Sequence, residues 1–194
     1  PEWREVSIRL CPKALTTYNL AYWANHDRLT GLANRGLFQD RLTESLLIVK
    51  SKAKQRAVLY VDVDGFKSVN DRLGHVAGDH LLQEIGRRLK KTVRDDDTVG
   101  RLGGDEFAII LNSATDHEGV LWVVKRLLDS LQQPFFYNHV QVDWVSATIG
   151  ISLSPQDGYE PDELLMKADE AMYYARKTKN AQYAFYSMVL QDKD

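Results

Sequence analysis

The heptapeptide Arg101-Leu102-Gly103-Gly104-Asp105-Glu106-Phe107 joins two apolar runs, Val99 to Leu102 and Phe107 to Leu111. Paired glycines between such runs predict a tight β-hairpin, because glycine can adopt the positive φ angles that these turns require. Two acids, Asp105 and Glu106, follow the glycines directly, although acidic residues are poor strand formers. One interpretation is a solvated turn with acidic decoration. The other is a rigid hairpin tip whose carboxylates hold a metal ion beside a ligand.

A second pair of acids ends an apolar run, Ala57-Val58-Leu59-Tyr60-Val61-Asp62-Val63-Asp64. Apolar residues without polar alternation predict a central strand that is covered on both faces. Side chains alternate along a strand, so Asp62 and Asp64 are expected on the same side. Two carboxylates are costly to desolvate without a partner, and a hard cation such as Mg²⁺ prefers carboxylate and carbonyl oxygens. A helix N-cap at Asp64 is the alternative, but it leaves Asp62 unexplained.

The residues that follow this strand include polar types suited to a guanine base. Guanine presents N1–H and N2–H₂ donors beside acceptors, and a carboxylate and a carboxamide can read that edge together. Asn70 and Asp79 carry these groups, and Lys67 could hold a phosphate as a point charge. The chemistry of His75 alone favours an ordinary polar loop residue.

Apolar spacing and turn residues predict the remaining elements. Helices are expected over about 12–25, from an N-cap at Asn34, over about 79–93, after a capping box at Thr115–Glu118, and from Pro161 onwards. Strands are expected twice within 135–151, joined at Asn138-His139, and once over 183–186, with a loop at 155–160 and a tail from 187 to 194. This order predicts an α/β (α+β) sandwich with a central, mainly antiparallel sheet flanked by helices.

The composition is that of one globular domain with short extensions. The chain has 194 residues, of which 44% are hydrophobic, and its formal net charge of −2 gives no indication of a nucleic-acid or membrane surface driven by bulk charge. No apolar stretch approaches the roughly 18 residues of a membrane span. The lone Cys11 fits a reducing compartment, and a start at Pro1 rather than Met is interpreted as a piece of a longer protein. We therefore expect a cytoplasmic location, either free or as the cytoplasmic part of a membrane-anchored protein.

Three motifs together resemble the GGDEF family, the diguanylate cyclases that make cyclic di-GMP. They occur in family order and at family spacing: Asp62-x-Asp64-x-Phe66-Lys67-x-x-Asn70-Asp71, Gly74-His75-x-x-Gly78-Asp79 and Arg101-x-Gly103-Gly104-Asp105-Glu106-Phe107. The string from Asp27 to Arg35 also looks like the family's opening D-x-L-T-G-L-x-N-R, and these two residues are expected to tie it to the body. The resemblance implies a nucleotidyl-cyclase palm over residues 26–187, an N-terminal arm or linker over 1–25, and a C-terminal tail or linker over 188–194.

The resemblance also implies roles in catalysis. Asp62, Asp105 and the backbone carbonyl of Val63 would hold Mg²⁺, or Mn²⁺ in its place, and Asp105 would accept the proton of the attacking hydroxyl. Glu106 would be a further acid beside the metal ions, and Lys67 would stabilise the transition state at the phosphates.

Other residues are implied to bind the substrate. Asn70 and Asp79 would recognise guanine, with Phe66 and His75 close by, and the presence of Asp79 favours GTP over ATP. Arg176 and Lys179 would hold the triphosphate. Their segment, Ala175-Arg176-Lys177-Thr178-Lys179-Asn180, departs from the family pattern A-K-x-x-G-[RK]-N, because it lacks the glycine and is one residue shorter. Which basic residue reaches which phosphate therefore stays open.

The implied reaction condenses two GTP molecules into cyclic di-GMP with release of pyrophosphate. Each 3′-hydroxyl attacks the α-phosphate of the other nucleotide, so two domains must face each other in a homodimer. No Walker-type lysine loop is present, which excludes a P-loop enzyme. Two alternatives stay open. One is a catalytically silent GTP-binding domain that controls an adjoining EAL phosphodiesterase domain, and the other is a dimerisation scaffold.

Arg94-x-x-Asp97 lies just upstream of the hairpin and resembles the family's inhibitory site, where the product cyclic di-GMP binds. Arginine can grip phosphate and stack on guanine, which suits this task, and Arg126 is a candidate contributor from the next helix. The alternative interpretation of the segment is a charged, solvated turn.

Overall fold

The computed structural model describes residues 22–52, 55–113, 116–179 and 181–192. Cys11 and most of the predicted N-terminal helix lie outside the described residues, and residues 22–25 are helical. A five-stranded sheet forms the centre of the molecule, with strand order β2-β3-β1-β6-β7. Its strands are β1 (Arg56–Asp64), β2 (Thr98–Gly103), β3 (Glu106–Leu111), β6 (Ser146–Ser154) and β7 (Tyr183–Phe185). Only β6 and β7 pair in parallel, so the predicted mainly antiparallel sheet is confirmed.

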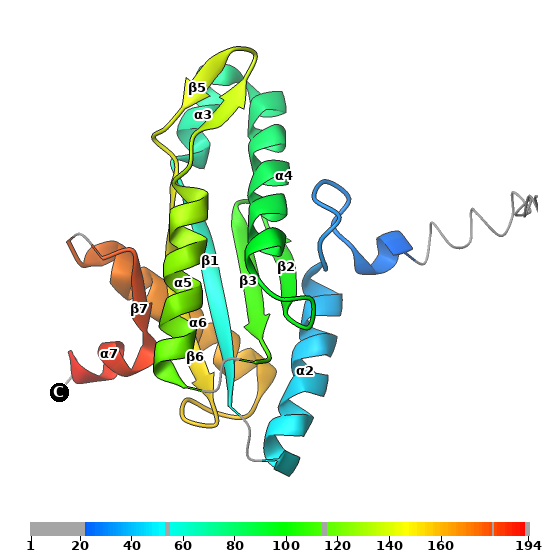
Figure 1. Cartoon of the computed structure of the whole chain (residues 1–194), viewed down its shortest axis with the longest axis vertical. Helices are drawn as coiled ribbons and strands as arrows, with labels where there is room; N and C mark the ends of the chain where they lie inside the picture. Colours follow the sequence, from blue (N-terminus) through cyan, green and yellow to red (C-terminus); the bar gives the residue numbers. More distant parts are fainter. Residues whose placement is uncertain (1–21, 53–54, 114–115, 180, 193–194) are drawn as a thin grey trace, which may run out of the picture.

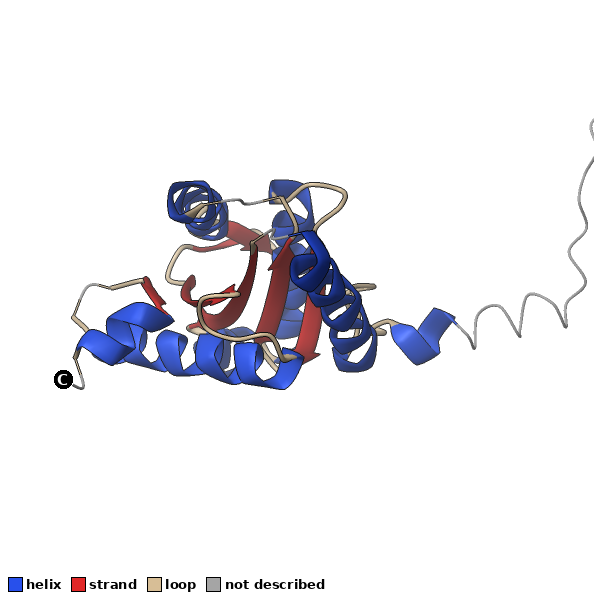
Figure 2. Cartoon of the chain, turned by 90° about the horizontal axis from the view of Figure 1, so that it is seen from below, coloured by secondary structure: helices blue, strands red, loops and turns tan. Residues whose placement is uncertain are grey.

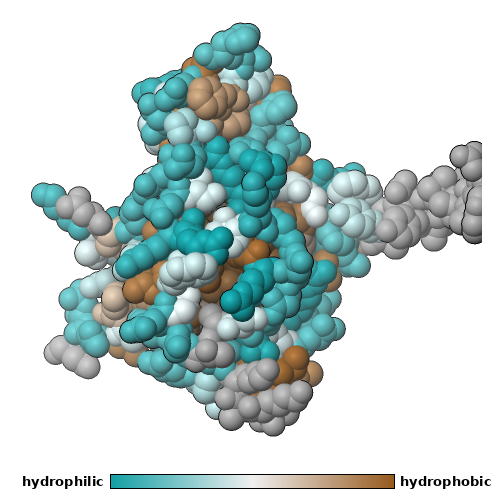
Figure 3. All heavy atoms as spheres, viewed as in Figure 1, coloured by the Kyte–Doolittle hydropathy of each residue, from teal (hydrophilic) through white to brown (hydrophobic). Residues whose placement is uncertain are grey.

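Strand β1 is the central strand, as its apolar run predicts. Leu59 and Val61 belong to one hydrophobic cluster and Val58 and Tyr60 to another, on opposite faces of the sheet. Helices α4 (His75–Thr92) and α5 (His117–Leu131) cover the first face, and α2 (Arg35–Lys52) and α6 (Pro161–Lys177) cover the second. Figure 2 shows these two helical layers on either side of the strands. On the face seen in Figure 3, hydrophilic side chains cover most of the surface.

A small hairpin stands apart from the main sheet. Strands β4 (Phe135–Tyr137) and β5 (Val140–Val142) pair with each other and lie near α3 (Phe66–Leu73) at one end of the molecule (Figure 1). Asn138 and His139 join them with φ angles of 45° and 66°, as a two-residue hairpin turn with positive φ requires. The prediction of two strands within 135–151 is wrong, because β6 begins in the same interval and makes three.

One helix boundary and the C-terminus also differ from expectation. Asp116, rather than Thr115, is the N-cap of α5, and its Oδ1 accepts a hydrogen bond of 2.7 Å from the backbone N–H of Gly119. Thr115 itself lies outside the described residues. The last strand ends at Phe185, and helix α7 (Tyr186–Gln191) replaces most of the predicted tail, because burial of Val189 holds this segment against the domain. The predicted N-cap of α2 is confirmed, since Asn34 Oδ1 accepts a hydrogen bond from the N–H of Leu37.

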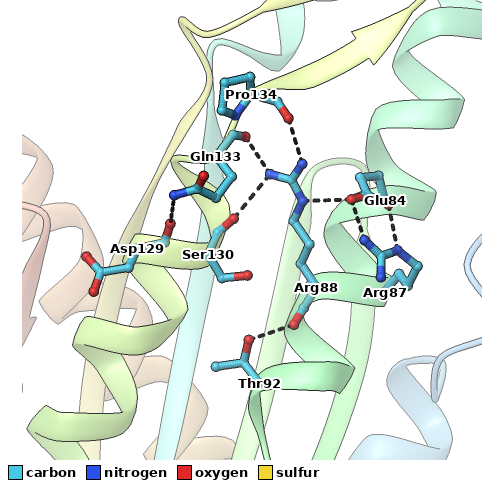
Figure 4. A network of polar contacts seen from close by, with 8 residues as sticks. All are labelled: Glu84, Arg87, Arg88, Thr92, Asp129, Ser130, Gln133 and Pro134. Carbon is cyan, nitrogen blue, oxygen red and sulfur yellow. Dashed lines mark hydrogen bonds and ion pairs between the residues drawn. The ribbon is translucent and has the colours of Figure 1, made fainter.

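Arg88 connects α4 to the end of α5. Its guanidinium donates hydrogen bonds to the carboxylate of Glu84 and to three backbone carbonyls (Figure 4). The carbonyl of Ser130 belongs to the last turn of α5, and those of Gln133 and Pro134 lie just beyond it. The last carbonyls of a helix have no partner within the helix and carry partial negative charge. The guanidinium of Arg88 therefore provides hydrogen-bond donors for the carbonyls at the end of α5 and fixes this end of the helix to α4.

Replacing Arg88 by methionine is expected to lower the free energy of unfolding by about 2–4 kcal/mol, because several partly buried carbonyls lose a charged donor at once. Urea denaturation measures the loss. Arg87→Met is the matched control, since Arg87 pairs with the same Glu84 but its side chain is 60% exposed. The control should leave stability almost unchanged, and equal losses in the two variants would contradict the carbonyl clamp.

Candidate active site

The predicted hairpin joins β2 to β3. Gly103 pairs with Glu106, so Gly104 and Asp105 are the two turn residues, and a register irregularity precedes them between Arg101 and Gly103. Gly103 and Gly104 have φ angles of 156° and 49°, and the second of these lies in the left-handed region that glycine adopts readily. Asp105 therefore lies within the turn rather than after it, and Glu106 is the first residue of β3.

Carboxylates from two neighbouring strands meet on one face beside this turn. Asp62 on β1 pairs directly with Glu106 on β3, which places both side chains on the same face. Like charges directly opposite each other in a sheet are destabilising, so the pair favours a positively charged partner. Asp64 lies two residues further along the same face, and its Oδ2 accepts a hydrogen bond of 2.7 Å from Thr148 Oγ1. The expected common side of Asp62 and Asp64 is confirmed, because both contact Arg176.

Arg176 is the positively charged partner. It extends from the last turn of α6, and its Nη2 lies 3.1 Å from Asp64 Oδ1 and also donates to Asp62 Oδ1. The hydrogen bond to Asp62 is the main reason that the pKa of Arg176 is raised above its ordinary value. Lys179, the other predicted phosphate ligand, is exposed just beyond α6, and the structure describes no contact between it and these acids.

Asp169 is an additional acid that the motifs did not indicate. Partial burial raises its pKa, and the nearby carboxylates of Asp62 and Glu170 raise it further. The signal that could have found Asp169 is its spacing, because it precedes Arg176 by two helical turns and so shares its side of α6.

The donor groups near the hairpin fit a magnesium ion. Among the described residues, no three His, Cys, Asp or Glu side chains form a ready-made metal cage. Mg²⁺ usually takes only one or two protein carboxylates and completes its shell with water and substrate phosphates. Asp62 and Asp64 already converge on one positive nitrogen, and the backbone N–H of Val63 donates to the carbonyl of Asp105 over 3.3 Å. The predicted ligands Asp62, Val63 and Asp105 therefore lie on adjoining ends of β1 and the hairpin.

Asn70 and Phe66 lie against Gly78, the residue before Asp79, where α3 packs against α4. The side-chain oxygen of Asn70 is buried and has no hydrogen-bond partner in the part of the chain that the structure describes. Asn70 lies against Gly78, where an added Cβ would fall 2.0 Å from this oxygen and 3.1 Å from the ring of Phe66. A Cβ at position 78 would therefore displace the side chain of Asn70. An unpaired buried acceptor suits a ligand that brings hydrogen-bond donors.

The remaining predicted substrate residues lie on the exposed parts of the same two helices. Lys67 is on the first turn of α3, and His75 is the first residue of α4. The interpretation of His75 as a loop residue is therefore wrong, because α4 begins directly after Gly74, whose φ of 87° allows the chain to turn between the helices.

The glycine turn between β2 and β3 is tied to the N-terminal segment by Arg101. Its Nε and Nη2 donate hydrogen bonds of 2.9 and 2.7 Å to the carbonyl of Gly104, and its Nη1 lies 3.1 Å from Asp27 Oδ1. Asp27 also accepts hydrogen bonds from the N–H and hydroxyl of Thr30. Arg35 Nε donates to the carbonyl of Leu102. The expectation that Asp27 and Arg35 tie this segment to the body is confirmed.

Asp27→Asn is expected to lower the free energy of unfolding by about 2 kcal/mol at neutral pH, because Arg101 loses its charged partner. Burial opposes ionisation of Asp27, but hydrogen bonds from Thr30 and Arg101 outweigh burial and lower the pKa of Asp27. A lowered folded-state pKa stabilises the fold above the ordinary pKa, and this stabilisation is lost as the pH falls through the folded value. Denaturation from about pH 6 down to about pH 3 should therefore show the two proteins converging in acid. A constant difference would contradict the assignment.

The predicted inhibitory residues line one pocket. A cavity of about 300 Å³ is lined by Arg94, Asp97, Arg126 and Trp122. The Arg126 guanidinium lies over the Trp122 ring, 4.4 Å from the ring centroid. Asp97 is only 6% exposed, and its two oxygens accept hydrogen bonds from the backbone N–H groups of Arg94 and Asn112. The interpretation as a solvated turn is therefore wrong for Asp97, because its carboxylate holds the turn together from inside.

A larger cavity lies elsewhere. It measures about 950 Å³, and it is lined by residues of α2, α4 and β2 rather than by Asp62 or Glu106. We place the candidate site at the carboxylates because their chemistry is unexplained by packing, whereas cavity volume alone carries no chemical information.

The sequence model of one protein family, described as "Diguanylate cyclase, GGDEF domain", matches residues 24–182. The chain belongs to this GGDEF family. Its sequence is 42% identical over 159 residues to the diguanylate cyclase TpbB of Pseudomonas aeruginosa. This alignment covers 82% of this chain and 37% of TpbB. It is 40% identical over 180 residues to the bifunctional diguanylate cyclase/cyclic di-GMP phosphodiesterase MucR of the same organism, which covers 93% of this chain and 26% of MucR.

Solved structures support the same assignment. A truncated TpbB that comprises only the GGDEF domain matches the GGDEF domain described above with a TM-score of 0.80 and 38% identity, and the match covers 86% of this chain and 99% of that one. The chain thus spans little more than a third of TpbB and about a quarter of MucR. Within the described residues, no helix combines the length and the apolar character needed to cross a membrane.

Proposed function

We propose that this GGDEF domain is a diguanylate cyclase that condenses two GTP molecules into cyclic di-GMP and releases two pyrophosphates. The observation that carries the proposal is the direct cross-strand pairing of Asp62 with Glu106 beside the turn that contains Asp105. Such a concentration of acids at a hairpin tip has no structural benefit of its own. It suits a site that neutralises and positions phosphates through a divalent ion.

Each residue near the hairpin has a defined task in this proposal. A bound Mg²⁺ would supply charge neutralisation at the phosphates, with Asp62, Asp105 and the carbonyl of Val63 as its ligands. Asp105 accepts the proton of the attacking 3′-hydroxyl, and its position in a glycine turn keeps its surroundings open to the substrate. Lys67 carries positive charge to the phosphates from the first turn of α3.

Guanine recognition is assigned to Asn70 and Asp79, with Phe66 and His75 nearby. The buried, unpaired oxygen of Asn70 supports this assignment, because guanine would bring the missing donor. One domain offers one such half-site, so the reaction requires a second copy of the domain that presents its own GTP. We therefore propose a homodimer as the active form.

Product inhibition is proposed for the pocket of Arg94, Asp97 and Arg126. The two guanidinium groups offer phosphate ligands, and Trp122, which is 58% exposed, offers an aromatic surface on which a base can stack. The pocket lies at the start of β2, which leads into the catalytic hairpin, so an occupied pocket could restrain the hairpin and the facing domain.

The function is tested by incubating concentrated protein with Mg²⁺ and either GTP or ATP and separating the products by liquid chromatography. We expect cyclic di-GMP from GTP and no cyclic dinucleotide from ATP. Asn70→Ala should weaken GTP binding by about 10-fold, whereas Ser68→Ala on the same helix should not. GTP binding without product at high protein concentration would contradict the cyclase, and equal use of ATP would contradict the guanine assignment.

A second candidate function is a silent GTP-binding domain that regulates an adjoining phosphodiesterase domain. The similarity to the bifunctional MucR favours it, since this chain covers only part of that protein. In a full-length protein with a phosphodiesterase domain, GTP should raise hydrolysis of cyclic di-GMP, and Asp79→Ala should abolish the effect. No response to GTP would exclude this candidate.

A further inference from the structure

Among the ion pairs of the described residues, only those of Arg176 reach Asp62 and Asp64. The arginine comes from the end of α6 and the acids from the end of β1, more than 110 positions away in the chain. A single nitrogen, Nη2, contacts an oxygen of each carboxylate. The guanidinium thus occupies the point at which the two acids converge.

The charge around this point is unbalanced. Glu106 faces Asp62 across the strand pair, and Asp169 is close enough for the charge of Asp62 to raise its pKa. One guanidinium therefore serves a group of acids that would repel one another without it. Its side chain remains 41% exposed, so it is held by charge rather than by packing and can leave without disturbing the core.

We propose that Arg176 is an internal counter-ion that a divalent cation must displace from Asp62 and Asp64, and that the displaced guanidinium then becomes available to the phosphates of the nucleotide. The inference rests on the proposed function, because it takes the divalent ion and the triphosphate from it. The reason for displacement is electrostatic. Two positive groups that share the same carboxylate oxygens repel each other, and the carboxylates cannot serve both fully.

Two consequences follow from this competition. The protein binds a divalent cation more weakly than its acids alone would, because part of the binding energy is spent in breaking the Arg176 ion pairs. The cation also prepares the triphosphate site, because Arg176 is released only when the cation is present. Lys177, one residue further along, does not take part, since its Nζ lies 4.1 Å from the centroid of the Tyr173 ring.

The test is a calorimetric titration of the nucleotide-free protein with Mn²⁺. Arg176→Gln should bind Mn²⁺ about 10-fold more tightly than the wild type, because the competitor is gone. Arg176→Lys keeps the positive charge but concentrates it on a single point, so its Mn²⁺ affinity should lie between those of the wild type and Arg176→Gln. Lys177→Gln is the matched control, since it removes the same unit of charge from the neighbouring residue, and its affinity should stay at the wild-type value.

A thermal melt in a chelator gives a second readout that needs no activity. Arg176→Gln should melt below the wild type without metal and regain most of the difference with Mn²⁺, whereas Lys177→Gln should show neither effect. Equal or weaker Mn²⁺ binding by Arg176→Gln would overturn the counter-ion and leave the cyclase proposal standing. Absence of Mn²⁺ binding in wild type and variant alike would overturn the metal site on which both proposals depend.

Discussion

Asp62→Asn is expected to lower the rate of cyclic di-GMP formation by about 10³-fold, while the domain remains folded. The amide keeps the shape of the side chain but removes the charge that faces Glu106 and Arg176. The neutral amide oxygen lacks the negative charge that is needed to hold a divalent ion next to the phosphates. The rate is measured by liquid chromatography at saturating GTP and Mg²⁺, with denaturation curves recorded on the same samples.

Asp40→Asn is the control for this prediction, because it removes one carboxylate from an exposed position on α2, remote in the chain from β1 and the hairpin. It should leave the rate unchanged. Full activity in Asp62→Asn would contradict the role of this acid. A loss of activity that parallels a loss of folded protein would assign Asp62 to stability instead.

Gly150→Ala is expected to lower the free energy of unfolding by more than about 4 kcal/mol, which is at the upper end for a single substitution. Gly150 lies in the middle of β6, opposite Tyr60 of β1 and Ala184 of β7. An added Cβ would fall 1.9 Å from the carbonyl oxygen of Ala168 and 2.2 Å from the backbone nitrogen of Met172. These are backbone atoms of α6, so no side-chain rotation can relieve the overlap, and the helix must move away from the sheet.

Gly36→Ala is the control, since an added Cβ there would make only an ordinary contact of 3.5 Å with Asn34. Alanine is a better helix former than glycine, so this variant in the first turn of α2 should be neutral or up to about 1 kcal/mol more stable. Urea denaturation compares the two variants with the wild type. If Gly150→Ala lowered the free energy of unfolding as little as a substitution at an exposed position does, α6 would not cross β6 so closely.

The strand and helix patterns in the sequence predicted much of the fold. The apolar run before Asp62 predicted the central strand, and the glycine pair predicted the hairpin of β2 and β3, because both signals depend on residues near one another in the chain. The short segments were harder to assign. The turn at Asn138-His139 was predicted correctly, but the three strands that begin within 135–151 were predicted as two. The C-terminal helix at 186–191 is too short for periodicity to separate it from its neighbours.

The sequence by itself determined the kind of site: the acids at Asp62, Asp64 and Asp105, the amide at Asn70, and the family to which these motifs belong. Only the tertiary structure decided which groups meet. Asp62 and Glu106 face each other because of the strand register. Asn70 packs against Gly78 because two helices approach each other. The ion pairs of Arg176 depend on how α6 crosses the sheet. Local patterns depend on the dihedral preferences and spacing of neighbouring residues. Contacts between separate elements depend on how whole elements pack, and no spacing rule along the chain records that packing.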